Sequence, residues 1–237
     1  MFYEHGQGEI SLQAMDSSHV SLVNLRIVGV GPYSITLTNG KSMDLGLNIN
    51  QVAKMLRCAD DDDFLTVETK EQEDHVKFQF TNAAQTKRSE FELKKLVIHG
   101  ERLGIPETRE TYSVKMPGAM FREICSNLSV VGETLEITVN SETIGFSCKG
   151  SFSQALIRCR NNHDKVSIGG LMDEGELTLA FALRYVCTFT KAAGLSEYVK
   201  IDFTEEMPLL IGYYDDLIHL EFFLAPRIED DDSEGSF

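Results

Sequence analysis

Apolar and polar residues alternate with a period of two along much of the chain, which is typical of half-buried strands in antiparallel sheets. In His75–Phe80, for example, Val76, Phe78 and Phe80 fall on one face. The same alternation recurs in Glu136–Val139, Thr143–Cys148 and Lys200–Phe203. The pattern therefore predicts a β-rich fold with few helices.

Three short segments change to the period of an amphipathic helix. They are Asn50–Cys58, Gly118–Val131 and Ala182–Ala193. The first carries Lys54 and Arg57 on its polar side, and the third carries Arg184 and Lys191, seven residues apart and so expected on one outer face. Pro117 stands at a favourable helix start for the second segment.

A strand followed by a short basic helix occurs twice, roughly 130 residues apart. LGLNI (Leu45–Ile49) precedes the first helical segment, and LTLAF (Leu177–Phe181) precedes the third. This repeat suggests a duplicated domain. We expect a first domain at residues 1–92, a connector at 93–107 that includes Gly-Ile-Pro, a second domain at 108–228 and an acidic, disordered tail at 229–237.

The charge balance first argues against nucleic acid as a partner. The 237 residues include 22 Lys and Arg against 37 Asp and Glu, a formal net charge of −15, whereas duplex DNA selects Lys and Arg. The cations nevertheless gather on the polar sides of two predicted helices. From charge alone, two interpretations stay open: an ordinary solvated face, or a local positive surface that faces a polyanion.

Catalytic and metal-binding patterns are not found in the sequence. The six histidines are scattered, the five cysteines show no CxxC spacing, and Asp60–Asp63 lacks the spaced ligands of a calcium loop. We therefore expect no enzyme, no cofactor and no metal site. Cys58, Cys125 and Cys187 stand among apolar residues and are expected to be buried structural thiols. No apolar run is long enough for a membrane helix.

Six segments, in order from Leu12 to the end, resemble the eukaryotic sliding-clamp family, proliferating cell nuclear antigen. They are LQAMDSSHVSLVNL (Leu12–Leu25), LGLNINQVAKMLRCADD (Leu45–Asp61), LGIPE (Leu103–Glu107), VKMPGAMFREIC (Val114–Cys125), LTLAFALRYVCTFTKA (Leu177–Ala192) and HLEFFLAPRIEDDD (His219–Asp232). A subunit of the related checkpoint clamp is the alternative. The segments resemble the replication clamp more closely.

The resemblance implies an α+β chain of two similar clamp domains, with antiparallel sheets outside and short helices lining a channel. Three such chains would form a homotrimeric ring around duplex DNA in the nucleus, held without base readout. The implied function is a non-catalytic processivity factor. Its expected partners are the replicative DNA polymerase, the clamp loader, and a nuclease and a ligase that carry clamp-binding peptide motifs.

The resemblance also assigns residues to three surfaces. The DNA-facing cations are Lys41, Lys54, Arg57, Arg184 and Lys191, whereas the helix after Pro117 departs from the family's basic pattern. The socket for partner peptides comprises Met15, His19, Leu22, Leu103, Ile105, Pro208, Phe223, Ala225, Pro226 and Ile228, with Phe223 in place of a family tyrosine. Ring closure would pair Gln85–Leu93, anchored by Phe91, with Gln154–Arg160 of the next chain.

The largest departure from the family pattern precedes Leu12. The family has a strand, a basic helix and another strand there, about 25 residues that MFYEHGQGEIS replaces. The second domain keeps its corresponding helix at Gly118–Val131. We therefore expect an incomplete first domain and impaired ring assembly, and the alternative function is an adaptor that binds peptides without closing on DNA.

Overall fold

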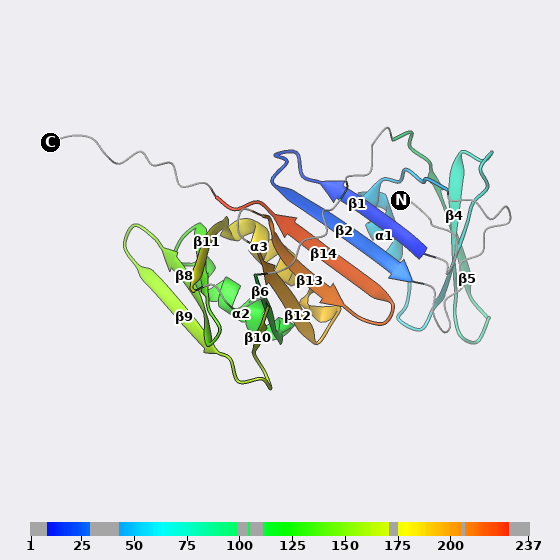
Figure 1. Ribbon diagram of the computed structural model, residues 1–237. Helices are drawn as coiled ribbons and strands as arrows, with labels where there is room; N and C mark the ends of the chain where they lie inside the picture. The colour runs from blue at the N-terminus through cyan, green and yellow to red at the C-terminus, as the bar shows by residue number, and fades with distance from the viewer. Residues whose placement is uncertain are drawn as a thin grey trace. The chain divides into compact units, whose positions relative to one another are not determined.

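The computed structural model describes residues 9–28, 43–98, 104, 111–170, 175–204 and 207–227. These residues form three antiparallel sheets and short helices (Figure 1). No described helix is long and apolar enough to cross a membrane. The strands are β1 (Glu9–Met15), β2 (Ser21–Val28), β3 (Phe64–Glu68), β4 (His75–Thr81), β5 (Arg88–Lys94), β6 (Tyr112–Pro117), β7 (Thr134–Val139), β8 (Thr143–Lys149), β9 (Gln154–Arg160), β10 (Ser167–Gly169), β11 (Leu177–Ala182), β12 (Tyr198–Phe203), β13 (Leu209–Tyr214) and β14 (Ile218–Leu224). The helices are α1 (Ile49–Leu56), α2 (Gly118–Ser129), α3 (Leu183–Phe189) and the 3₁₀ segment η1 (Thr190–Gly194).

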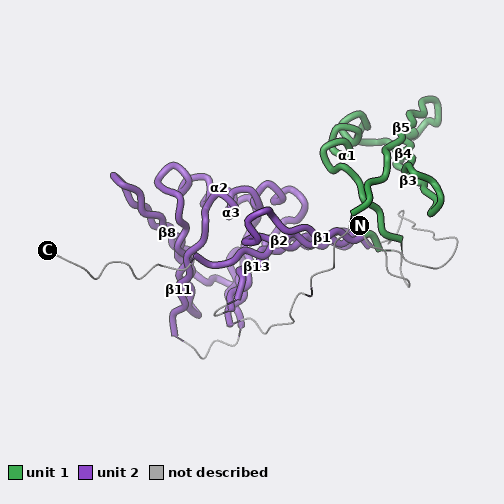
Figure 2. The backbone as a smooth tube through the Cα atoms, turned by 90° about the horizontal axis from the view of Figure 1, so that it is seen from above, with its two compact units in different colours: residues 1–10, 35–103 green, residues 11–34, 104–237 purple. Residues whose placement is uncertain are grey.

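The chain divides into two compact units (Figure 2). Unit 1 comprises Met1–Ile10 and Ile35–Leu103, and unit 2 comprises Ser11–Ser34 and Gly104–Phe237. This division differs from the boundaries expected from the sequence, because residues 11–34 group with the second unit. The reason is that β2 pairs along its length with β14. The expected tail lies outside the described residues, and the first residues of the expected connector belong to β5.

Unit 2 holds the larger core, between two sheets. Its seven-stranded sheet has the order β1-β2-β14-β13-β12-β6-β10, and its four-stranded sheet has the order β11-β7-β8-β9. One cluster of buried side chains joins both sheets to α2 and α3. Phe121 of α2, for example, lies 5.9 Å from Phe146 of β8 between ring centroids. The alternation predicted for β7 and β8 is confirmed, because Leu135, Ile137 and Val139 are buried on one face of β7.

The helices start close to the predicted residues, but all three end earlier, α1 at Leu56, α2 at Ser129 and α3 at Phe189. The Asn48 side chain caps α1 by accepting hydrogen bonds from the Asn50 and Gln51 amides at 3.1 and 3.2 Å. The second begins directly after Pro117, as predicted. The third is not one α-helix through Ala193: its α-helical part stops at Phe189, and η1 continues from Thr190. The Thr190 hydroxyl donates to the Cys187 carbonyl oxygen at 2.9 Å at this junction.

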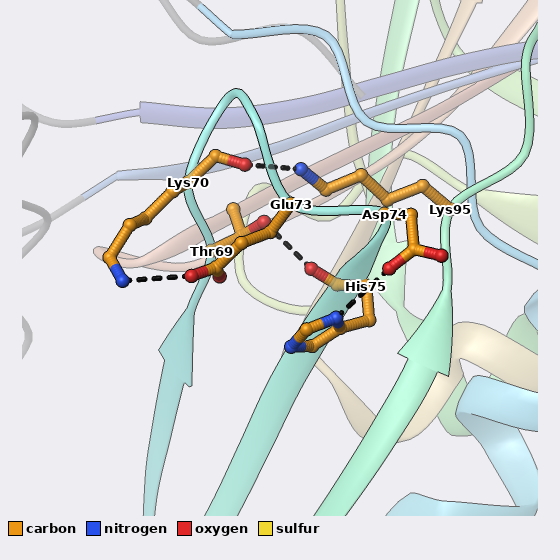
Figure 3. Close-up of polar contacts among 6 residues, drawn as sticks. All are labelled: Thr69, Lys70, Glu73, Asp74, His75 and Lys95. Atoms are coloured by element: carbon orange, nitrogen blue, oxygen red, sulfur yellow. Dashed lines mark hydrogen bonds and ion pairs between the residues drawn. The ribbon is translucent and has the colours of Figure 1, made fainter.

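Unit 1 has a small core. Its described sheet has the order β3-β4-β5, and Val76, Phe78 and Phe80 are buried with Met55 of α1. This confirms the alternation that the sequence shows in β4. Polar contacts close the β3–β4 loop (Figure 3): Lys70 pairs with Glu73 at 2.8 Å, and Lys95 Nζ donates to the Lys70 carbonyl oxygen at 2.6 Å. The loop is therefore held by an ion pair within it and by a hydrogen bond from Lys95, the residue after β5.

Helices α1 and α3, which the sequence repeat suggests are counterparts, differ in their packing. The residues that precede them, Asn48 and Ala182, have nearly the same backbone angles, φ −75° and ψ 108° against φ −73° and ψ 108°. The first helical residue in unit 2, Leu183, is 1% exposed, whereas Ile49 is 60% exposed in unit 1. In unit 2 the third helix packs on α2. No described residue of unit 1 forms a second helix, so the apolar side of α1 has fewer neighbours.

The cysteines differ in burial. Cys125, Cys148 and Cys159 are buried and Cys187 is half-buried. Burial, with a smaller effect of the nearby Cys187, raises the pKa of the Cys125 thiol well above its usual range. The prediction of a buried Cys58 was wrong. Cys58 is exposed because it lies beyond the last residue of α1, and its thiol donates to the Lys54 carbonyl oxygen at 3.6 Å.

A buried hydroxyl gives a stability prediction. The Tyr213 hydroxyl is buried and has no hydrogen-bond partner in the described part of the chain, and burial raises its pKa. Removing an unsatisfied buried polar group removes its desolvation cost, so Tyr213→Phe is expected to raise the free energy of unfolding by about 1 kcal/mol. Urea denaturation measures the change. Tyr112→Phe is the matched control, because the Tyr112 hydroxyl donates to the Gly175 carbonyl oxygen at 2.5 Å and its loss should destabilise. A less stable Tyr213→Phe would contradict this account.

Candidate functional site

An aspartate organises the turn between β1 and β2. Asp16 accepts hydrogen bonds from the backbone amides of Ser18, Val20 and Ser21 at 3.1, 2.9 and 2.8 Å. The Tyr185 hydroxyl of α3 donates to the same carboxylate at 2.8 Å. His19 takes a left-handed backbone conformation at the tip, with φ 58°. The carboxylate therefore fixes the turn that carries Met15 and His19, two of the predicted socket residues.

These hydrogen bonds dominate the titration of Asp16. Partial burial alone would raise its pKa, but the Ser21 amide, the Tyr185 hydroxyl and the other amides lower the pKa from 3.8 to about 2. The charged form is therefore the one that holds the turn at neutral pH.

The predicted socket residues lie on unit 2 wherever the structure describes them. Leu22 of β2 pairs directly with Phe223 of β14, and Phe223 pairs in turn with Leu210 of β13. These three side chains form a cross-strand row on one face of the sheet. The Ala225 amide donates to the Val20 carbonyl oxygen at 2.9 Å, so the segment after β14 continues beside the turn. Four other predicted members are close in sequence to these strands. Met15, His19 and Pro208 are exposed and Pro226 is half-buried, and Pro208 directly precedes β13.

Leu210 is a member of this row that the sequence analysis missed. Leu210 is identified by its pairing with Phe223. This pairing follows from the strand register, which the sequence does not reveal. Three predicted members, Leu103, Ile105 and Ile228, lie outside the described residues.

Packing on the opposite face of the sheet directs Phe223 outward. Phe222 stacks on Phe189 of α3, with ring centroids 4.4 Å apart and planes 11° apart. Since successive side chains of a strand point to opposite faces, Phe223 lies on the face away from α3. The half-buried Phe223 is therefore available beside Leu22 and Leu210.

The predicted DNA-facing cations are exposed on helical segments. Lys54 belongs to α1 and Arg57 follows its last residue, while Arg184 and Lys191 belong to α3 and η1. None of the four forms an ion pair with a described residue. The described ion pairs of Lys and Arg lie on strands and loops, at Lys70, Lys77, Lys87, Arg88 and Lys200. Lys191 lies in η1, beyond the α-helical part. The seven-residue spacing of a continuous α-helix therefore does not determine which face Lys191 shares with Arg184. Lys41 lies outside the described residues.

The two strands predicted for ring closure are at sheet edges. Among the described strands, β5 pairs only with β4, and β9 pairs only with β8. Gln154 and Arg160 are exposed at the two ends of β9. The first expected strand, Gln85–Leu93, is shifted: it runs from Arg88 to Lys94, because Gln85 lies in the preceding turn with φ 55°. Phe91 is half-buried and meets Phe80 edge-on at 5.8 Å.

The Asp16 turn gives a pH prediction. The pKa of Asp16 is lowered on folding, so its contribution to stability is complete above about pH 4 and is lost as pH falls through about 2. The amide signals of Val20 and Ser21 should therefore shift in NMR spectra with a midpoint near pH 2. Asp16→Asn is the control and should abolish this titration. A midpoint at the ordinary value of 3.8 would contradict the assigned hydrogen bonds.

Comparison with known families matches both parts of the chain in order. Residues 2–102 match the N-terminal domain of proliferating cell nuclear antigen, and residues 104–227 match its C-terminal domain. Sliding clamps of this family are non-enzymatic scaffolds that encircle DNA and bind polymerases and repair proteins. The two matches, with the antiparallel sheets and short helices described above, identify the fold as the α+β clamp fold. The chain belongs to the proliferating cell nuclear antigen family of DNA sliding clamps.

Proposed function

We propose that this protein is a sliding clamp that tethers a replicative DNA polymerase and repair proteins to duplex DNA in the nucleus. The observation that carries the proposal is the placement of its cations. The chain is strongly acidic overall, yet Lys54, Arg57, Arg184 and Lys191 are exposed on helical segments without an ion-pair partner among the described residues. Unpaired cations can exchange mobile phosphate contacts without base readout, as sliding requires.

Ring closure is proposed to use the two edge strands. An open strand edge pairs with another chain through main-chain hydrogen bonds, and β5 and β9 each have one side without a described partner strand. Pairing β5 of one copy with β9 of the next is a head-to-tail contact that closes only if the rotation is right. A homotrimer of 26.5 kDa chains, about 80 kDa, is the expected assembly.

The socket is proposed to capture partner peptides that carry an apolar or aromatic plug. Phe223, Leu22 and Leu210 provide the apolar row. The turn held by Asp16 carries two further members of the socket, Met15 and His19. A clamp loader, a nuclease and a ligase with such motifs would use the same surface. Exposed apolar side chains gathered on a rigid sheet are what a peptide-binding surface requires.

An adaptor that captures peptides without encircling DNA is the second candidate. The observation that favours it is the small core of unit 1, where α1 exposes Ile49 and the buried cluster among the described residues consists of Met55, Val76, Phe78 and Phe80. A subunit of a checkpoint clamp would share the fold. The assembly state and the mode of DNA retention separate these candidates.

The first test is retention on circular DNA. A closed ring should remain on closed circular duplex and leave after linearisation, with a mass near 80 kDa by light scattering. Lys54→Ala with Arg57→Ala should reduce the slope of log affinity on log salt by about 0.9 for each phosphate that the protein no longer neutralises. Lys70→Ala with Lys77→Ala is the matched control, because both cations lie in the same unit outside β5 and already pair with carboxylates, Glu73 and Glu90. A monomer that does not distinguish circular from linear DNA would support the adaptor instead.

The second test concerns the socket. Phe223→Ser should weaken binding of a fluorescent plug peptide by at least ten-fold, since burying a large aromatic side chain is worth about 1.5–3 kcal/mol. Phe152→Ser removes a fully exposed phenylalanine of the same unit and should leave the affinity unchanged. Circular dichroism checks that both variants fold. Equal affinity of Phe223→Ser and the unchanged protein would refute the socket.

A further inference from the structure

A polar cluster lies one row along the sheet from the socket. The register that pairs Leu22 with Phe223 also pairs Asn24 with Glu221, and Glu221 pairs with Gly212 of β13. Residues two apart in a strand share a face and are separated by about 7 Å. Glu221 therefore lies on the same face as Phe223, within the reach of a single bound peptide.

Neutral groups hold the Glu221 carboxylate in place. One oxygen accepts a hydrogen bond from Asn24 Nδ2 at 3.0 Å, and the other accepts one from the Tyr214 hydroxyl at 3.1 Å. Neither donor carries a charge, and no described cation forms an ion pair with Glu221. Lys200 follows Gly212 in the same row but pairs with Asp202 at 2.7 Å. The carboxylate is thus oriented but not neutralised.

The Tyr214 ring lies beside this carboxylate, over Gly212. A Cβ atom at Gly212 would collide with the ring and the hydroxyl oxygen of Tyr214, so a larger residue there would require the Tyr214 side chain to move. The His219 ring meets it edge-on, with centroids 5.6 Å apart and planes 73° apart. The aromatic ring therefore contacts Gly212 and His219, and its hydroxyl is directed at Glu221.

An aromatic ring beside a fixed carboxylate suits a Lys or Arg side chain. The aliphatic stem of such a side chain packs on the ring, and its charged head reaches the carboxylate. Arg26, which pairs with His219 one row further along, is the nearest described cation on β2.

We propose that Tyr214, Glu221 and Asn24 form a subsite for one Lys or Arg side chain of the peptide that docks at Phe223. The inference rests on the proposed peptide-capture function and adds a chemical requirement to it. Partner peptides would carry a single basic residue placed about 7 Å from their apolar plug, the separation of Glu221 and Phe223 along β14. The occupant is a peptide, recognised by its charge at this position.

The test measures affinity by fluorescence polarisation for a series of peptides with the full chain. The parent peptide has an apolar and aromatic plug with neutral flanks, and each other peptide carries one Arg at a different flanking position. Arg at one position, or at two adjacent ones, should raise the affinity about five-fold, as expected for a partly exposed ion pair. Glu221→Gln should remove this gain and leave the affinity for the parent peptide unchanged. Glu136→Gln is the matched control and should keep the gain, since Glu136 is also a strand carboxylate that accepts a hydroxyl hydrogen bond, from Ser147 at 2.9 Å.

The outcomes separate the subsite from the socket. If the parent peptide binds but no Arg position raises its affinity, the subsite is overturned and the socket stands. If the gain appears but persists in Glu221→Gln, the subsite is also overturned, because another group supplies the charge. If the unchanged protein binds no peptide of the series, the socket fails and the subsite fails with it.

Discussion

The antiparallel pairing of β2 with β14 joins residues almost 200 positions apart, and the proposed socket depends on it. Asn24 and Glu221, which hydrogen-bond across this pair, are separated by 197 residues. The pairing brings Leu22 beside Phe223 and places the Asp16 turn next to the segment after β14. A one-residue change of register would turn Leu22 and Asn24 to the opposite face. The apolar row with Phe223 and the hydrogen bond with Glu221 would both be lost.

The same pairing connects the socket to the helices. Phe222 stacks on Phe189, and Tyr185 of the same helix donates to Asp16. The guanidinium of Arg184 lies 5.0 Å from the Tyr185 ring. One helix thus packs on the face of the sheet opposite the proposed socket and carries one of the proposed DNA contacts. An acidic chain can combine these roles because charge acts locally: Lys54, Arg57, Arg184 and Lys191 are exposed on helical segments, whereas the described Lys and Arg that form ion pairs lie on strands and loops.

The sequence predicts local elements well and long-range placement poorly. The alternation around Val76, Phe78 and Phe80 identified a strand, since a strand buried on one face has apolar residues at every second position. The end of α3 was not predictable, because the change to 3₁₀ geometry at Thr190 depends on packing and on a hydroxyl bond to Cys187. Leu210 and Glu221 gave no signal, since their roles come from their neighbours across the sheet. The socket residues were proposed from family resemblance, and their geometry required the register.

The grouping of Ser11–Ser34 with unit 2 makes unit 1 largely an insertion in the chain of unit 2. The boundary between the two family matches, near residue 103, is therefore one boundary of unit 1, but Ser11–Ser34 belong to unit 2 although they precede it in the chain. A fragment that begins at Gly104 would lack β1 and β2 and would expose the edge of β14 along its whole length. Such a fragment could recover its missing strands only from another molecule, so exchange of strands between copies would compete with its folding as a monomer.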